Sequence, residues 1–527
     1  MKRLKEYYKR QIEKMGKKQK ITFYTASVIL SILIILSIVS LSYAFFTSII
    51  TGNETAKGDV VETGTLSIVY TNGQELRGES IEPGWSLSKT FTVENRGTVE
   101  ATYNINWENL TNTFVNKEDL VMSLTSTNGG GTLEETQIRG SGSHINIIKN
   151  IKIDPGVIQE YTLTIEYKNK DYDQSSDMGK SLIGKIEVRD AKEVLNEEYI
   201  ATDYIIGKYS EDNTEGLIKL NQPATEQTPA LVEYRYSGSN DVVKNYVNFN
   251  NETWRIIGVF PTDDGTGNIE NRVKIIREES IGNYSWDSSP AGVNDYLETN
   301  ILGAGVNQWG ESGTYEGADL MRLLNPEYES ENINNSLYWN RESGTCYYGN
   351  NNQTTSCDFS DSGLTEETKN MIRDAKWYLG AVDQRGITTL DAFVQERGKK
   401  IGIADIGISI TKTTSWIGKV GLMYPSDYGY ASRECYENEK LYQADKNDYR
   451  QEICVRTNWM YNNNFQWTLS SYVGAISNVI HVHNHGNLGY IAAFRTYYLT
   501  RPVTYLTSDV KIVGGDGTIE NMYQLSL

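Results

Sequence analysis

The sequence has few of the residues on which enzyme sites depend. Its 527 residues include only four cysteines and four histidines. No Cys-x-x-Cys pair occurs, which excludes the usual zinc-finger spacings, and no His-Glu-x-x-His occurs, which excludes the commonest metalloprotease site. Gly-x-Ser-x-Gly, Gly-x-x-x-x-Gly-Lys-Ser/Thr and a complete Gly-x-Gly-x-x-Gly are also missing, so neither a nucleophile elbow nor a nucleotide-binding loop is indicated. We therefore expect no catalytic residues, no cofactor and no enzyme activity.

Positive charge is scarce outside the first 20 residues. The net charge is −18. Residues 1–20 contain nine basic and two acidic side chains, so this segment carries +7 and the remainder −25. Because so acidic a body repels phosphate backbones, we expect no nucleic-acid partner.

Proline is scarce as well, whereas aromatic residues are plentiful. The chain has 9 Pro, 36 Tyr and 10 Trp. Many aromatic side chains favour folded, β-rich domains over disorder, and the length predicts a multidomain chain of about two to four domains.

One long uncharged stretch follows the basic segment. Residues 21–41 read ITFYTASVILSILIILSIVSL, which is long enough to cross a bilayer. The basic residues 1–20 should remain in the cytoplasm, with the bulk of the chain outside. Ser42, Tyr43 and Ala44 also form a plausible signal-peptidase site. Two readings stay open: residues 21–44 are a permanent transmembrane helix, or they are a signal peptide and the protein is secreted after cleavage near Ala44.

Two stretches of the sequence share one layout. IEPGWSLSKTFTVENRG begins at Ile81 and IDPGVIQEYTLTIEYKN begins at Ile153. In each, a Pro-Gly turn precedes alternating apolar and polar residues, which is typical of a half-buried strand. Similar runs occur at residues 64–70, 99–107, 120–125, 145–153 and 181–188. Seven or eight short strands predict an all-β immunoglobulin-like sandwich over residues 60–192.

The order SYAFFTSI, GTLSIVY, IEPGWSLSKTFTVENRGTVEATYNINW resembles the secreted camelysin and TasA family of Gram-positive bacteria over residues 42–190. The resemblance implies a cell-surface or matrix-fibre protein. Protease activity, attributed to some relatives, is not expected because His144 is the only histidine of this region. If cleavage follows Ala44, the exposed FFTSII could complete a neighbour's sheet edge and allow self-assembly. Alternatively, FFTSII is only the outer end of a membrane helix.

The remaining sequence predicts a linker at residues 193–235 and an α+β domain at residues 236–527. We expect a hairpin at 246–260, a strand at 273–282, a helix at 319–325 and a second helix running from Thr365 through Leu379. Further strands are expected at GKVGLMY, WTLSS and RPVTYL. WRIIGVF, SIGNYSWD, LMRLLN, AKWYLG, GKVGLMYPSDYGYA and GGDGTIENMYQL resemble an uncharacterised domain of Firmicutes surface proteins, over residues 234–527. That resemblance implies a C-type-lectin-like fold related to sulfatase-modifying factors.

The four cysteines stand as two neighbouring pairs. An even number in an exported domain indicates disulfides, and Cys346–Cys357 with Cys435–Cys454 is the simplest of three connectivities.

Three of the four histidines lie in HVHNH, at His481, His483 and His485. On an extended strand they would share one face, where imidazoles can converge on zinc or copper. The alternative is a polar loop in which histidine is incidental.

These observations predict a non-enzymatic bacterial cell-surface or extracellular-matrix protein. Its partners would be the membrane, through residues 21–44 unless they are cleaved, and an extracellular protein or glycan bound by the C-terminal domain for adhesion. One alternative is a carbohydrate-binding, lectin-like module. Another is an enzyme related to sulfatase-modifying factors, which would need reactive free thiols.

Overall fold

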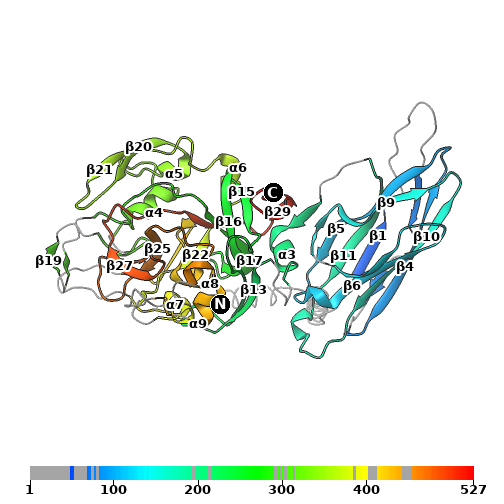
Figure 1. Cartoon of the computed structure of the whole chain (residues 1–527), viewed down its shortest axis with the longest axis horizontal. Helices are drawn as coiled ribbons and strands as arrows, with labels where there is room; N and C mark the ends of the chain where they lie inside the picture. Colours follow the sequence, from blue (N-terminus) through cyan, green and yellow to red (C-terminus); the bar gives the residue numbers. More distant parts are fainter. Residues whose placement is uncertain are drawn as a thin grey trace, which may run out of the picture. The chain divides into compact units, whose positions relative to one another are not determined.

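A computed structural model describes residues 48–52, 68–72, 76–78, 82–138, 140–192, 197–209, 215–289, 293–295, 298–301, 305–312, 315–383, 387–401, 412–438, 440–441 and 454–527. The described chain is mostly β and divides into two compact units (Figure 1). Unit 1 comprises residues up to Ile138 together with Asn146–Glu193, and unit 2 comprises Arg139–Ile145 and Val194–Leu527.

Unit 1 is a β-sandwich-like pair of sheets. The first sheet has the strand order β2 (Ile68–Asn72), β4 (Ser86–Asn95), β10 (Ile158–Tyr167), β6 (Leu120–Ser126) and β7 (Leu133–Gln137). The second has β9 (Ile145–Ile153), β5 (Ala101–Asn112), β11 (Leu182–Asp190), β1 (Ser48–Gly52) and β3 (Leu76–Gly78). Buried and accessible residues alternate along β4 and β10, as the sequence predicts for strands with one face in the core.

The two copies of the sequence repeat form the central pair of the first sheet. β4 and β10 are antiparallel neighbours, with Phe91 opposite Tyr161. The turn of each copy is bonded to the end of the other strand: Gly84 N donates to Tyr167 O at 2.7 Å, and Gly156 N donates to Asn95 O at 2.8 Å. Both glycines have positive φ, 92° and 74°, which side chains rarely tolerate. The repeated layout is therefore required twice because the two turns make equivalent contacts.

Strand β1 enters unit 1 at residue 48. It pairs parallel to β11, with Ile49 opposite Ile183, and antiparallel to β3, with Ile49 opposite Arg77. The segment at residues 21–44 lies outside the described residues. Within the part of the chain that the structure describes, no helix is both long enough and apolar enough to cross a membrane.

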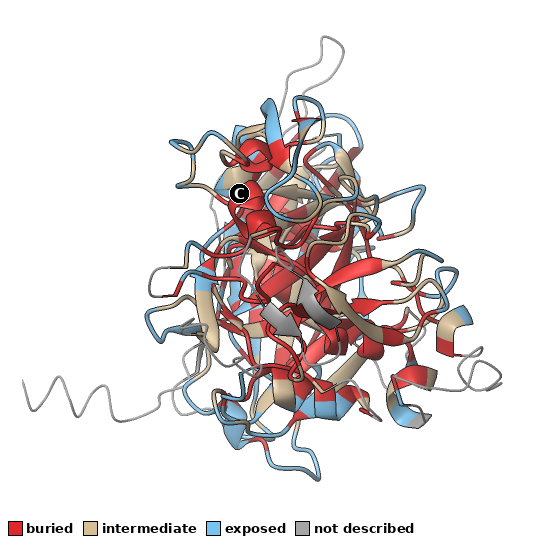
Figure 2. Cartoon of the chain, turned by 90° about the vertical axis from the view of Figure 1, so that its left-hand side faces the viewer, coloured by how far each residue is buried: buried red, intermediate tan, exposed pale blue. Residues whose placement is uncertain are grey.

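Unit 2 is built on one large sheet with smaller sheets and short helices around it. The large sheet has the order β24 (Val420–Gly421), β28 (Val503–Tyr505), β17 (Ile269–Arg277), β16 (Glu252–Asp263), β15 (Tyr246–Phe249), β30 (Tyr523–Ser526), β29 (Lys511–Gly514), β12 (Glu198–Ile200) and β8 (Gly142–Ser143), and β14 (Leu231–Tyr236) joins β16 and β13 (Leu217–Gln222). The smaller sheets are β18 (Val293–Asp295) with β19 (Glu298–Ile301), β20 (Ser343–Tyr347) with β21 (Thr354–Asp358), β22 (Ala375–Tyr378) with β23 (Ser415–Gly418), and β25 (Gln466–Ser471) with β26 (Asn478–Val482) and β27 (Leu488–Ala492). The helices are α3 (Ala201–Ile206), α4 (Asp319–Leu324), α5 (Leu337–Asn340), α6 (Glu366–Asn370), α7 (Thr389–Glu396), α8 (Pro425–Tyr430) and α9 (Arg433–Asn438). In Figure 2, buried segments gather in the interior and exposed segments in the peripheral loops.

The structure differs from the sequence predictions at residues 193–235 and after Thr365. Residues 193–235, expected as a linker, contribute β12, α3, β13 and most of β14 to this unit, because β14 pairs with β16 and completes its sheet. The helix expected from Thr365 does begin there, with the Thr365 side chain accepting from Thr368 N, but α6 ends at Asn370. Residues 375–378 instead form β22, paired with β23. The apolar spacing that suggested a longer helix comes from residues buried in other contacts.

Candidate functional site

The two predicted disulfides are present. Cys346–Cys357 joins β20 to β21. Cys435–Cys454 joins α9 to the first residue of the described range 454–527. Among the described residues there is no unpaired cysteine. Each bridge staples a short loop, which stabilises the fold by restricting the unfolded chain.

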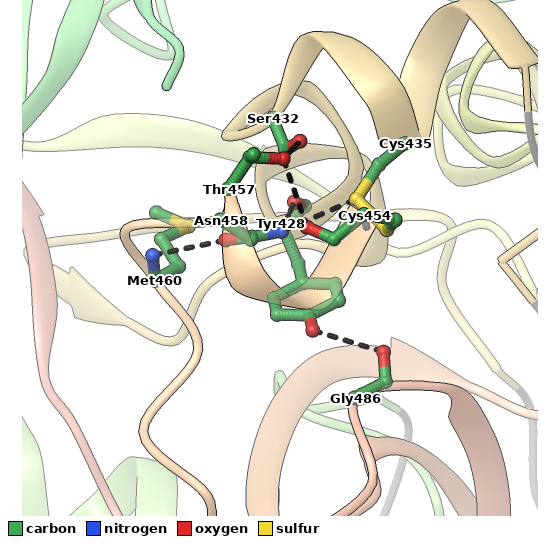
Figure 3. The surroundings of a disulfide bond; sticks show 8 residues. All are labelled: Tyr428, Ser432, Cys435, Cys454, Thr457, Asn458, Met460 and Gly486. Carbon is green, nitrogen blue, oxygen red and sulfur yellow. Dashed lines mark hydrogen bonds between the residues drawn. A yellow bond between two sulfur atoms is a disulfide. The ribbon is translucent and has the colours of Figure 1, made fainter. Parts of the chain in front are cut away.

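A hydrogen-bonded frame surrounds the second disulfide (Figure 3). Asn458 Nδ2 donates to Tyr428 O at 2.8 Å and lies 3.6 Å from Cys435 Sγ. The Tyr428 hydroxyl donates to Gly486 O at 2.9 Å, so α8 is tied to the turn after β26. The disulfide is thus part of the unit 2 core.

The three histidines of the predicted metal site do not share one face of a strand. His481 is in β26, is buried, and has its pKa lowered to about 3 by burial and by His483. His483 and His485 lie beyond the strand in a turn, where His485 N donates to His483 Nδ1 at 3.2 Å. Across the described ranges, no three His, Cys, Asp or Glu side chains are grouped to hold a metal ion. The prediction of one shared strand face was wrong because the strand ends at Val482.

A cluster of buried charges lies inside unit 2, and sequence patterns gave no sign of it. Arg235 on β14 contacts Asp427 on α8 at 2.8 Å and Glu233 at 2.9 Å. Lys274 on β17 contacts the other Asp427 oxygen at 2.5 Å. Burial opposes ionisation of Asp427, but Lys274 and Arg235 outweigh it and lower the pKa of this carboxyl. Glu396, the last residue of α7, and Arg397, which follows it, extend the cluster.

These charges are enclosed by protein. The guanidinium of Arg235 lies 4.5 Å from the Phe260 ring centre and 4.8 Å from that of Tyr430. Lys274 Nζ lies 4.5 Å from the ring centre of Tyr424. Each charged group of the cluster is buried. We interpret the cluster as a polar core that fixes β14, β17, α7 and α8 together.

A pair of buried carboxyls occurs elsewhere in unit 2. Asp287 Oδ2 accepts from Ser289 Oγ at 2.6 Å, Val306 N at 2.5 Å and Tyr315 Oη at 2.9 Å. Asp319, the first residue of α4, accepts from Ser288 Oγ and N, and from Arg322. Burial, followed by the neighbouring Asp319 charge, raises the pKa of Asp287 to about 7.

Two carboxyls with separated pKa values can act as an acid–base pair when a substrate reaches them. Here both side chains are buried and hold neighbouring groups in place. We therefore assign them a structural role.

An open polar site is found on unit 1. A cavity of about 410 Å³ lies on the outer face of the first sheet, lined by Thr71, Thr90, Phe91, Thr92, Thr125, Ser126, Thr127, Glu160, Tyr161 and Thr162. Threonines from three strands stand in register, with Thr162 opposite both Thr90 and Thr125. Directly opposed side chains on one sheet face lie about 5 Å apart. The surface therefore presents closely spaced hydroxyl groups with one carboxylate, Glu160.

The same face continues beyond the cavity. Ser88 Oγ and Thr164 Oγ1 are hydrogen-bonded at 2.8 Å across β4 and β10. Beneath it, the rings of Phe91 and Tyr161 stack with centres 5.0 Å apart, and Tyr161 Oη lies 2.6 Å from Tyr103 Oη. The alternation of the sequence repeat could have located this face, because the outward positions of its strands are polar except for Ile158.

Comparisons with known proteins give little additional information. No family model matches the chain, and no curated protein matches it. Among solved structures, a PapD-like domain of human CEP192 is similar to part of this chain. The match covers 27% of this chain and all of that domain, at 12% sequence identity and a TM-score of 0.11. A likeness of that strength identifies neither the fold nor the function.

Proposed function

We propose that this chain is a non-enzymatic bacterial cell-surface or extracellular-matrix protein that acts by binding partners. The observation that carries the proposal is the pair of disulfides in unit 2, because structural disulfides persist in oxidising compartments outside the cytoplasm. In this proposal residues 21–44 deliver the chain across the membrane, and either remain as a transmembrane anchor or are cleaved near Ala44.

The finer fold assignments belong to the same proposal. Unit 1 would be an immunoglobulin-like sandwich of the camelysin and TasA type, serving as a stalk. Unit 2 would be a C-type-lectin-like head that makes adhesive contacts. Two closely packed sheets in unit 1, and short helices around a β core in unit 2, support these assignments.

Adhesion can be tested on cells that display the full chain. We expect them to bind an extracellular-matrix or mucin-coated surface more strongly than cells displaying the chain without residues 197–527. Equal binding by the two strains would contradict a role for unit 2 in adhesion.

Self-assembly would use β1. This strand is bonded along both edges, to β11 and β3, and it follows the proposed cleavage position closely in sequence. A β1 supplied by a neighbouring chain would make the same backbone bonds, and repeated exchange would give a fibre. The ordered position of β1 within its own unit is also compatible with a monomer.

Electron microscopy of a chain that begins at Phe45 tests this step. We expect fibres from that chain and none from the Ile49→Pro variant, because proline removes a backbone donor in the middle of β1. Circular dichroism of both proteins would establish that unit 1 remains folded. Persistent monomers from the unmodified chain would refute strand exchange.

A carbohydrate-binding role is a second candidate, favoured by the threonine-lined cavity on unit 1. Rows of hydroxyls with a carboxylate match the hydrogen-bonding groups of a sugar. A glycan array with and without a calcium chelator would test it. We expect Thr162→Val to reduce a specific signal, and Thr136→Val, outside the cavity on β7, to preserve it. An array without specific signals would eliminate this candidate.

A further inference from the structure

Two segments of unit 2 that are far apart in the sequence meet through a lysine and an asparagine. Lys412 precedes β23, and its Nζ lies in contact with Oδ1 of Asn307, 105 residues away. The next residues are also paired, since Gln308 Nε2 donates to Thr413 Oγ1 at 2.9 Å. A third contact follows, with the rings of Trp309 and Trp416 centred 6.3 Å apart. The amine and the carboxamide are therefore held together by contacts on the neighbouring residues.

Asn307 is fixed in one orientation. Its backbone N donates to Ile476 O at 2.7 Å. Its Nδ2 donates to the carbonyl oxygens of Ala475 and Asn478, both at 2.6 Å, and lies 3.3 Å from Tyr472 O. The side chain is 2% exposed. These donor contacts turn the amide nitrogen toward the 472–478 loop and leave the carbonyl side of the amide facing Lys412.

Lys412 has no carboxylate to balance its charge within the described part of unit 2. Its Nζ contacts the uncharged Asn307 oxygen. An ammonium group without a counter-charge is costly to bury, so the neutral amine is favoured. Burial lowers the pKa of Lys412 to about 7. At neutral pH a substantial fraction of this side chain is therefore a free amine with a nucleophilic lone pair.

We propose that Lys412 and Asn307 become joined by an intramolecular isopeptide bond. The lone pair of Lys412 Nζ attacks Asn307 Cγ, and an Nζ–Cγ bond forms. The Cγ–Nδ2 bond then breaks, and Nδ2 leaves as ammonia after taking one proton from Nζ. The reaction needs no oxidant, reductant or cofactor. Its product is a neutral secondary amide in place of a partly buried amine, which removes the cost of desolvating that charge.

The cross-link would add a third covalent tie to unit 2. It joins the segment before α4 to the segment before β23, and it closes a loop much longer than either disulfide loop. Cross-links that close longer loops restrict the unfolded chain more strongly. Unlike a disulfide, an amide is not opened by thiols, so this tie would survive reduction.

Mass spectrometry of the reduced, tryptically digested full-length protein tests the proposal. We expect one branched peptide that contains both Lys412 and Asn307 and that has lost one ammonia relative to the two linear peptides. Recovery of both residues only in separate linear peptides of unaltered mass would overturn it.

Two variants separate the cross-link from other losses of ammonia. The branched peptide should be absent from Lys412→Ala and present in Lys419→Ala, since Lys419 instead pairs with Asp374 at 2.8 Å. A loss of ammonia at Asn307 that persists in Lys412→Ala would show cyclisation of the asparagine on its own backbone and would refute the bond. The digest of the unmodified protein decides the question even if a variant does not fold.

Discussion

The buried carboxylates Asp119 and Asp177 of unit 1 are satisfied differently from Asp427 of unit 2. In unit 1, Asp119 accepts from the Tyr172 hydroxyl and the Gln174 amide, and Asp177 accepts from backbone N–H groups of Val115 and Asn116. In unit 2, Asp427 lies between two cations, Arg235 and Lys274. Neutral donors hold a carboxylate at modest cost, whereas a buried ion cluster depends on every member being present. Unit 2 should therefore be the more sensitive of the two to loss of a single charged side chain, and it is also the unit with disulfides.

Among the substitutions considered, Asp427→Ala should cause the largest loss of stability, and it tests this sensitivity directly. Replacing Asp427 by alanine leaves Arg235 and Lys274 without their shared counter-charge, and breaking a buried pair in this way costs about 3–5 kcal/mol. We expect faster amide hydrogen exchange throughout unit 2 and little change in unit 1. The matched control is Glu100→Ala in unit 1, whose partner Lys152 is 70% exposed. Equal destabilisation by the two substitutions would show that the ion cluster has no special role.

The second disulfide provides the next comparison. Cys435→Ala together with Cys454→Ala opens the loop between residues 435 and 454, and the expected loss is roughly 3 kcal/mol of unfolding free energy. Chemical denaturation followed by tryptophan fluorescence measures it. Addition of a reductant should destabilise the unmodified protein more than the double variant, which retains only Cys346–Cys357. Equal responses of the two proteins would show that Cys435–Cys454 contributes no stability.

The buried carboxyls should make unit 2 less stable as the pH rises. Asp287 keeps its proton up to about pH 7 in the fold, whereas an unfolded aspartate ionises near pH 4. At Asp287 the folded state therefore binds the extra proton in this window, so the contribution of this residue to stability is complete below about pH 4 and is lost as the pH rises toward 7. Each such group contributes at most about 1.4 kcal/mol per pH unit.

Asp287→Asn should reduce that slope in denaturation curves measured from pH 4 to 8. It should not abolish the slope, because burial also raises the pKa of Glu396 to about 7. An unchanged slope in the variant would contradict the assignment of Asp287 as a protonated core residue.

The smallest expected effect is in unit 1. Tyr103 Oη lies 2.6 Å from Tyr161 Oη, and Gln159 Oε1 is also within hydrogen-bonding distance. Tyr103→Phe removes this hydroxyl and should cost about 1 kcal/mol, seen as faster exchange in β5 and β10. Tyr172→Phe, at a half-exposed ring, is a useful comparison within the same unit. A larger loss for Tyr103→Phe than for Asp427→Ala would reverse the proposed difference between the units.

The sequence predicts unit 1 better than unit 2. The run at 145–153 coincides with β9, and the repeat locates β4 and β10, because strands with one buried face alternate visibly. β17 is buried on both faces in its C-terminal part, so Lys274 looks like an outward residue in the sequence although it is in the core. Its partner Asp427 is 153 residues away, a separation at which no local pattern gives a signal.

Local sequence patterns also predicted only some of the candidate sites. Cysteine number and spacing were sufficient for the disulfides, since short loops favour neighbouring pairs. The histidine spacing was misleading because it assumed a strand that ends at Val482. The contact between Asn307 and Lys412 depends on the tertiary fold, so no sequence motif predicts it.

Protease treatment of intact cells tests the central claim of export most directly. The account predicts that a protease added outside releases peptides from both units, including residues around the disulfides, while a cytoplasmic marker protein remains intact. If both units stay uncleaved until the cells are lysed, the chain is not exposed at the surface, and the proposed adhesive role is contradicted.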